Sequence, residues 1–303
     1  MARPPANALR VLLARAIDYA GLYPPAHLGM AEACAAYDSY LRSDDAWALG
    51  RFVVPASRLG ELAGTCARAN GSDASPRWRL SAVLGSDVDA ELARVREFND
   101  RFAGAGAFSA TVEAVELRAA EPAGAKRAVA AAGSGLECYV EIPVADDPDL
   151  LVRTIGAAGG RAKVRTGGTT ADAIPPSGQV IRFLARCVEA RVPFKATAGL
   201  HHPLRGDYAL TYAPDSARGT MFGFLNVFLA TALLFAGHGE SVALKALEEQ
   251  SAKAISFHED GIAWREHQLT RDHLAAARSL AIVSFGSCSF REPLDDLAAL
   301  RLA

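Results

Sequence analysis

Residues 161–168 read RAKVRTGG, and residues 193–200, about thirty positions later, read PFKATAGL. Both runs are made of small, β-branched or aromatic residues around one lysine and stop near a glycine, which is typical of short buried strands. Each is followed by a segment with the apolar periodicity of a helix. A strand–helix unit that repeats makes neighbouring strands parallel, because each helix carries the chain back to the start of the sheet.

The same unit recurs along the chain. Strand-like runs begin near residues 15, 51, 78, 108, 136, 161 and 193, and an eighth covers residues 280–286. Eight such units predict an α/β protein with a single (β/α)8 TIM-like barrel domain over residues 1–303. Alternation around an Asp-Gly pair predicts a β-hairpin insertion over residues 254–268, before the last strand. The alternative is an open doubly wound sheet, which would more often place a glycine-rich turn after its first strand than DYAGLYPPA.

Composition narrows the functional class. The 303 residues are 50% hydrophobic and 22% charged, with a formal net charge of −2, which argues against nucleic acid or an anionic membrane as partner. The most apolar stretch predicts a buried helix over residues 219–236 and is too short for a membrane span. Five widely spaced cysteines predict reduced thiols and a cytoplasmic protein. Cys288 is interpreted as a small buried residue, because no partnered histidine is apparent.

Charged residues lie inside the fifth, sixth and seventh strand runs. Side chains alternate along a barrel strand between the lumen and the surrounding helices. The apolar residues of AKVRT and FKATA need the helices, so Lys163, Arg165 and Lys195 must point into the lumen. Glu141 of the preceding run joins them, and all four fall near the carboxyl ends of the strands, where the active sites of barrels lie.

Two interpretations of these charges remain open. One is a buried ion-pair layer, in which Glu141 neutralises one lysine. The other is catalytic and assumes an excess of positive charge in the lumen. Two ammonium groups close together would favour the neutral amine on one of them, and such an amine can form a Schiff base with a carbonyl compound.

The two lysine strands resemble those of class I aldolases of the deoxyribose-phosphate aldolase type. The resemblance covers residues 136–202 and rests on KVRTG (163–167) and KATAG (195–199), which are similar to the K-x-x-T-G and K-x-x-x-G strands of that family. It implies that Lys163 forms a Schiff base, that Lys195 tunes its proton affinity, and that no cofactor is needed.

The neighbouring acids follow the family pattern in part. In that family the strand before the first lysine ends in a glutamate, and Glu141 stands in a similar place. Arg165 replaces a small residue of the family, and Glu113 is the candidate for the proton-shuttling acid of an earlier strand. Asp18 ends the first strand run and is a candidate to move protons or to pair with a cation in the lumen. Its alternative role is to cap the turn.

Polar loops at the carboxyl ends of the strands predict that the ligand is a small anionic molecule. The Gly/Thr-rich loop after the sixth run offers amides and hydroxyls suited to a phosphate or carboxylate. Loops after the seventh and eighth strands often bind phosphate in such barrels. The predicted anion-binding residues are Arg165, Thr166, Gly167, Gly168, Thr169, His201, Gly286, Ser287 and Ser289.

Three functions fit these patterns. The first is an aldolase-like lyase that uses the amine of Lys163 on a small anionic carbonyl substrate, without metal or cofactor. The second is a metal-dependent isomerase or hydrolase that uses His201 or His202 with Glu141. The third is a barrel that binds an anionic metabolite without catalysis. The sequence leaves open whether the chain forms a homo-oligomer.

Overall fold

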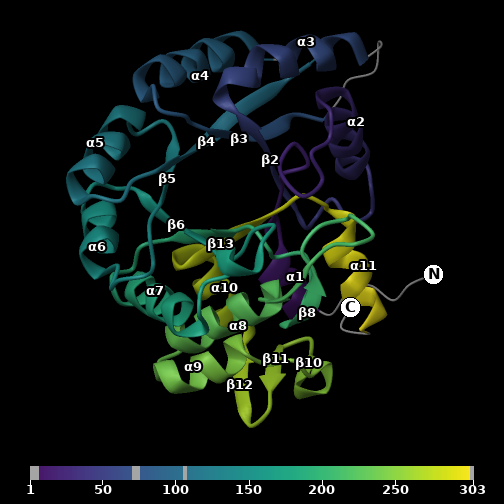
Figure 1. The fold of residues 1–303 in the computed structure, drawn as a ribbon, viewed down its shortest axis with the longest axis vertical. Coiled ribbons are helices and arrows are strands. Elements are labelled where there is room, and N and C mark those ends of the chain that lie inside the picture. The colour runs from purple at the N-terminus through teal and green to yellow at the C-terminus, as the bar shows by residue number, and fades with distance from the viewer. Residues whose placement is uncertain (1–6, 70–75, 105–107, 301–303) are drawn as a thin grey trace.

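The computed structural model describes residues 7–69, 76–104 and 108–300. Eight parallel strands close into a barrel in the order β1-β13-β7-β6-β5-β4-β3-β2, which confirms the predicted (β/α)8 fold. Figure 1 shows the strands around the centre and the helices outside them. The barrel strands are β1 (Ile17–Tyr19), β2 (Leu49–Pro55), β3 (Trp78–Val83), β4 (Ala110–Arg118), β5 (Glu137–Glu141), β6 (Arg161–Arg165), β7 (Phe194–Thr197) and β13 (Ile282–Ser287).

The helices between these strands are amphipathic and cover the outer face of the barrel. In α4 the side chain of Asp87 accepts a hydrogen bond from the amide of Ala90 at 3.1 Å, and the buried Leu92, Val95 and Phe98 recur at intervals of three. This is the spacing that turns one helical face toward a core. The helices are α1 (Asn7–Leu13), α2 (Met30–Leu41), α3 (Leu59–Ala69), α4 (Val88–Phe102), α5 (Pro122–Ala132), α6 (Asp149–Ala157), α7 (Ser177–Glu189), α8 (Phe224–Phe235), α9 (Glu240–Leu247), α10 (Arg271–Leu280) and α11 (Arg291–Ala299).

The predicted alternation along the strands is confirmed. Ala162 and Val164 of β6 and Phe194 of β7 belong to the hydrophobic core. Lys163 and Lys195 take the other face, and each contacts a carboxylate from the next strand but one around the barrel. The period of two therefore sorts these strands into an apolar outer face and a charged lumen.

The apolar helix α8 is buried in the protein. Its Phe224 ring stacks on Phe285 of β13, with ring centroids 4.9 Å apart. Asn226 donates hydrogen bonds to the carbonyl oxygens of Ala246 and Glu249, both at 2.8 Å, so this polar side chain is satisfied inside the helix packing. Among the described residues, no helix combines the length and apolar character that crossing a membrane requires.

The predicted hairpin insertion is present and is larger than expected. β10 (Ile255–Phe257) and β11 (Gly261–Trp264) form the hairpin, and β12 (His267–Thr270) extends it to a three-stranded antiparallel sheet. Figure 1 shows this sheet outside the ring of barrel helices, beside α9.

The helix predicted over residues 219–236 is wrong at its amino end. β9 (Arg218–Met221) pairs antiparallel with β8 (Gly206–Ala209), and α8 begins only at Phe224. A Cβ atom at Gly219 would lie 3.1 Å from Ile174, so this β8–β9 hairpin packs on the loop after β6. The prediction failed because the apolar residues at the end of β9 run directly into those of the helix, and periodicity cannot separate a short strand from a helix there.

The carboxyl ends of β6 and β7 approach closely at two glycines. Gly199 has a φ of +76°, and a Cβ atom there would lie 3.2 Å from Cα of Gly167. A left-handed backbone costs an L residue about 1–2 kcal/mol, and this contact adds to that cost.

We expect Gly199→Ala to lower the free energy of unfolding by about 1–2 kcal/mol or more, measured by urea denaturation. Gly178→Ala is the matched control, because Gly178 lies exposed in the first turn of α7 with open space around it. That variant should be as stable as the wild type or more stable by up to about 1 kcal/mol. Equal stability of the two variants would contradict the expectation.

Candidate active site

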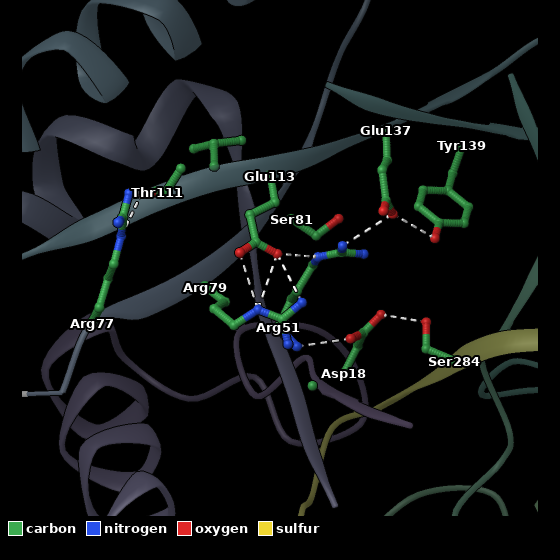
Figure 2. A network of polar contacts seen from close by, with 12 residues as sticks. Asp18, Arg51, Arg77, Arg79, Ser81, Thr111, Glu113, Glu137, Tyr139 and Ser284 are labelled. Carbon is green, nitrogen blue, oxygen red and sulfur yellow. Dashed lines mark hydrogen bonds and ion pairs between the residues drawn. The ribbon is translucent and has the colours of Figure 1, made fainter. Parts of the chain in front are cut away.

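The amino-terminal part of the lumen is filled by an ion-pair layer. Glu113 of β4 lies between Arg51 and Arg79, with N–O distances of 3.1 and 2.9 Å. Arg51 also contacts Glu137 at 3.0 Å, and the hydroxyl of Tyr139 donates to Glu137 at 2.9 Å. Figure 2 shows how these side chains converge from neighbouring strands. Because its carboxylate is committed to two arginines, Glu113 closes this end of the barrel and is not the acid beside the lysines.

The acid beside the lysines is Glu116, which the sequence analysis missed. Its side chain is 2% exposed; one carboxylate oxygen lies 2.9 Å from Nζ of Lys163 and the other 2.7 Å from Nζ of Lys195. The hydroxyl of Ser81 donates to the carboxylate at 2.6 Å. One carboxylate thus bridges the two ammonium groups, whose residues are register partners on β6 and β7.

An irregularity in β4 explains why the sequence pattern did not reveal Glu116. Strict alternation from Glu113 would turn residue 116 outward. The register of its pairing with β3 instead shifts: Val112 pairs with Leu80, and Ala114, two positions later, pairs with Ser81, the next residue of β3. This places an extra residue in β4, so both glutamates face the lumen although they are three positions apart.

Lys195 is held between two carboxylates. Its Nζ lies 2.6 Å from Asp18 and 2.7 Å from Glu116. Asp18 is held in turn by the hydroxyl of Ser284 at 2.8 Å and by the amide of Arg51 at 2.8 Å. Burial by itself would lower the pKa of Lys195, but the two carboxylates outweigh it and raise that pKa above its usual range.

The same charges act on the acids. Burial disfavours the ionised form of Glu116, but Lys163 and Lys195 outweigh it and hold the pKa of Glu116 well below its usual range. Glu141 contacts Lys163 at 2.9 Å through one oxygen and Arg118 at 2.9 Å through the other. Burial likewise opposes its ionisation, and Lys163 is the largest of the charges that lower its pKa.

The expected excess of positive charge around the lysines is wrong. Asp18, Glu116 and Glu141 face Lys163 and Lys195, and each ammonium group contacts two carboxylates. The Glu116 carboxylate lies between the two ammonium groups and offsets the repulsion between their charges. Sequence reasoning counted too few acids because it considered Glu113 on this strand and did not consider Glu116.

A cavity of about 790 Å³ opens above this cluster at the carboxyl ends of the strands, as expected for a barrel enzyme. Both lysines, Glu116 and Glu141 line it. The side chain of Lys163 is more exposed than that of Lys195 (8% against 2%). Arg165 lies at the rim with its side chain 43% exposed, 3.3 Å from Glu141, so it borders the cavity and is not buried in the lumen.

Tyr23, in the loop after β1, is a further cavity residue that the sequence analysis did not identify. Among the described residues its buried hydroxyl has no hydrogen-bond partner. Burial, together with the charge of Glu116, raises the pKa of Tyr23 above its usual range. The phenol thus has hydrogen-bonding capacity that its described neighbours do not use. An isolated tyrosine carries no sequence pattern that could have indicated this.

The predicted anion-binding residues separate into two groups. Gly167, Gly168, Thr169 and Gly286 line the cavity with Arg165 and His201. The remaining hydroxyls bond within the protein: Thr166 donates to the carbonyl of Ala198 at 2.7 Å, and Ser289 accepts from the amide of Glu292 at 3.1 Å. Ser287 is 1% exposed and accepts a long bond from the amide of Ser289 at 3.4 Å.

The two adjacent histidines point to different neighbours. His202 contacts Asp296 at 2.6 Å and stacks on Tyr208. His201 lines the cavity, and its Nδ1 lies 3.4 Å from Glu292. Glu141 is committed to Lys163 and the rim arginines, so the metal site suggested from these residues is not assembled. In the part of the chain that the structure describes, no three or more His, Cys, Asp or Glu side chains are grouped so that they could hold a metal ion.

No protein-family model and no curated protein matches the chain. Among solved structures, a nitroalkane oxidase from Streptomyces ansochromogenes is similar over 65% of this chain and 62% of its own, at 14% sequence identity and a TM-score of 0.33. The chain therefore matches less than two thirds of that enzyme. A likeness of this size carries no argument about function, and the barrel is established here by its own strand pairing.

We expect Glu116→Gln to lower the free energy of unfolding by about 3–5 kcal/mol, because it removes the carboxylate that two buried ammonium groups share. Glu121→Gln is the control: Glu121 is exposed at the start of α5, and its loss should change stability by less than about 0.5 kcal/mol. Urea denaturation at pH 7 measures both. A Glu116→Gln variant as stable as its control would show that the bridge is not needed.

Proposed function

We propose that the chain is an aldolase-like lyase in which the amine of Lys163 forms a Schiff base with a small anionic carbonyl compound. One observation supports this above all: Nζ of Lys163 lies at the floor of the cavity and contacts two carboxylates, Glu116 and Glu141, both at 2.9 Å. The local resemblance of the two lysine strands to class I aldolases points to the same residue.

The charge balance of the site suits this chemistry. A protonated Schiff base carries one positive charge at the lysine nitrogen, as the ammonium group does. The carboxylates that stabilise the ammonium group of Lys163 can therefore stabilise the iminium that replaces it. The intermediate needs no new counter-ion, and the desolvated charges around it stay paired throughout.

Proton transfer is available at the contact distance. For attack, the Lys163 ammonium gives one proton to Glu116 or Glu141 and becomes a neutral amine. The amine nitrogen bonds to the carbonyl carbon and its second proton passes to the carbonyl oxygen, giving a neutral carbinolamine. The carboxyl group then returns its proton to the departing hydroxyl, which leaves as water, and the iminium remains. The iminium draws electrons from the neighbouring bond, which eases proton loss or carbon–carbon cleavage there.

Lys195 has a supporting part in this proposal. Its raised pKa keeps it protonated, so it does not compete with Lys163 as a nucleophile at neutral pH. Its contact at 2.7 Å and that of Ser81 at 2.6 Å hold the Glu116 carboxylate toward Lys163. Asp18 fixes Lys195 at 2.6 Å and is a positioning residue in this scheme. Of the roles that the sequence suggested for Asp18, this is the pairing with a cation in the lumen.

The rim supplies the specificity for an anion. Arg118 and Arg165 stand at the ends of β4 and β6, and both contact the same oxygen of Glu141, at 2.9 and 3.3 Å. Their side chains are 73% and 43% exposed, so a phosphate or carboxylate of the substrate can reach their guanidinium groups.

Reductive trapping tests the nucleophile. With glyceraldehyde 3-phosphate as probe and cyanoborohydride as reductant, we expect one adduct, mapped to Lys163 by peptide mass spectrometry. Lys163→Met should lose this adduct, whereas Lys126→Met, which removes an exposed lysine of α5, should keep it. An adduct on Lys195 or on surface lysines alone would refute the proposal. Binding of the probe without trapping or turnover would favour the non-catalytic alternative.

Replacement of the rim arginines tests the anion site. In Arg118→Met/Arg165→Met we expect half-saturation of trapping by glyceraldehyde 3-phosphate to rise about tenfold or more. This corresponds to the loss of one charge-assisted hydrogen bond of about 1.5–3 kcal/mol. In the same double variant, trapping by unphosphorylated glyceraldehyde should be unchanged. The control is Arg153→Met, which removes an exposed arginine of α6 and should leave half-saturation by glyceraldehyde 3-phosphate unchanged. An equal effect on both probes would show that the arginines do not bind the phosphate.

A further inference from the structure

A second cluster, made of a thiol and an imidazole, borders the same cavity as the lysine pair. Cys288 follows β13 directly and lines the cavity together with His201 from the loop after β7. Sγ of Cys288 lies 3.8 Å from Nδ1 of His201. The sequence analysis interpreted Cys288 as a plain buried residue because no histidine partner was apparent; the fold supplies that partner across 87 positions.

Groups from each surrounding element face the imidazole. Glu292 of α11 lies 3.4 Å from Nδ1 of His201, and Ser287 of β13 lies 3.5 Å from the same atom. Tyr212, from the β8–β9 hairpin, donates to Glu292 at 2.9 Å and lies 3.4 Å from Sγ of Cys288. The neighbouring ring of His202 is committed to Asp296. The thiol of Cys288 and the carboxylate of Glu292 thus approach the same atom, Nδ1 of His201.

The electrostatics favour a charged imidazole here. Burial by itself would lower the pKa of His201, but its contacts with Cys288 and Glu292 outweigh burial and raise that pKa to about 9. Burial opposes ionisation of Glu292 too, and the hydrogen bond with His201 lowers its pKa. The thiolate is the nucleophilic form of cysteine, and a cationic imidazole at this distance is a partner for its negative charge.

We propose that Cys288 and His201 form a second nucleophilic centre of the cavity, which binds a small aldehyde as a thiohemiacetal. The thiolate sulfur of Cys288 bonds to the aldehyde carbon, and the carbonyl π pair moves to the oxygen. His201 gives its Nδ1 proton to that oxygen, which leaves a neutral imidazole and a neutral adduct. Glu292 and Tyr212 are positioning residues that hold the imidazole beside the sulfur.

The other cysteines lack these features. Cys34 and Cys66 are buried against each other, with their sulfur atoms 3.4 Å apart. Burial raises the pKa of the Cys138 thiol to about 12 and that of the fully buried Cys187 above its usual range. Cys288 differs because it borders the cavity and its thiol faces a histidine. The reactivity inferred for the Cys288 thiol does not involve the lysines. The choice of an aldehyde as its ligand rests on the proposed function, because Lys163 and Cys288 line the same cavity.

Alkylation by iodoacetamide under pseudo-first-order conditions tests the thiol. The sulfur bonds to the methylene carbon and iodide leaves, and intact-mass and peptide mass spectrometry follow the product. We expect one fast modification at Cys288 in the native protein, absent in Cys288→Ser and kept in Cys187→Ala. In His201→Gln the rate at pH 7 should fall about tenfold or more, because the thiolate loses its cationic partner.

The pH profile separates an electrostatic role of His201 from a merely structural one. The imidazolium is present below the His201 pKa of about 9 and is lost above it. The rate advantage of the wild type over His201→Gln should therefore be largest near neutral pH and disappear above about pH 9. A constant ratio across this range, or equal rates at pH 7, would overturn the pairing.

A second arm tests the ligand. Glyceraldehyde, added before iodoacetamide without reductant, should slow the alkylation of Cys288 at least threefold, and glycerol at the same concentration should not. Protection by the aldehyde should persist in Lys163→Met, which cannot form the Schiff base. Absence of protection would overturn the aldehyde assignment. Cyanoborohydride trapping at Lys163 in Cys288→Ser keeps this outcome distinct from failure of the proposed function.

Discussion

Glu116 is the residue on which the interior of this barrel depends. It is buried between the ammonium groups of Lys163 and Lys195, with contacts of 2.9 and 2.7 Å. A buried charge without a partner costs several kcal/mol, so this single carboxylate makes both lysines tolerable in the lumen. It also couples β4, β6 and β7, because a shift of any one strand would leave a desolvated charge unpaired.

Two charged layers replace the apolar side chains that usually fill such a lumen. The lower layer, around Glu113, Arg51 and Arg79, is closed by mutual ion pairs and supports the barrel (Figure 2). The upper layer, around Glu116, has the same kind of pairing but opens on the cavity. The structural and the candidate catalytic charges thus differ in their position relative to the cavity, because only the upper layer lines it.

The cavity brings distinct chemical groups together from strands that are remote in sequence. Lys163 with its two carboxylates lies at the floor, the guanidinium groups of Arg118 and Arg165 stand at the rim, and Cys288 with His201 lies on the wall between β7 and β13. An amine and a thiol are both nucleophiles toward carbonyl carbon, and the arginines attract an anion. The proposal of a small anionic carbonyl compound as the ligand rests on this convergence.

Eight strand-like runs at regular intervals leave few topologies other than a barrel, so the fold could be predicted from the amino-acid sequence alone. Alternation is strict along β5, β6 and β7, so the lumenal positions of Lys163, Lys195 and Glu141 could be predicted as well. The remaining features of the site depend on tertiary contacts. The irregular pairing of β4 turned Glu116 inward, which local alternation cannot reveal. The meeting of Cys288 with His201 depends on strand closure between distant segments, and no local pattern records such a contact.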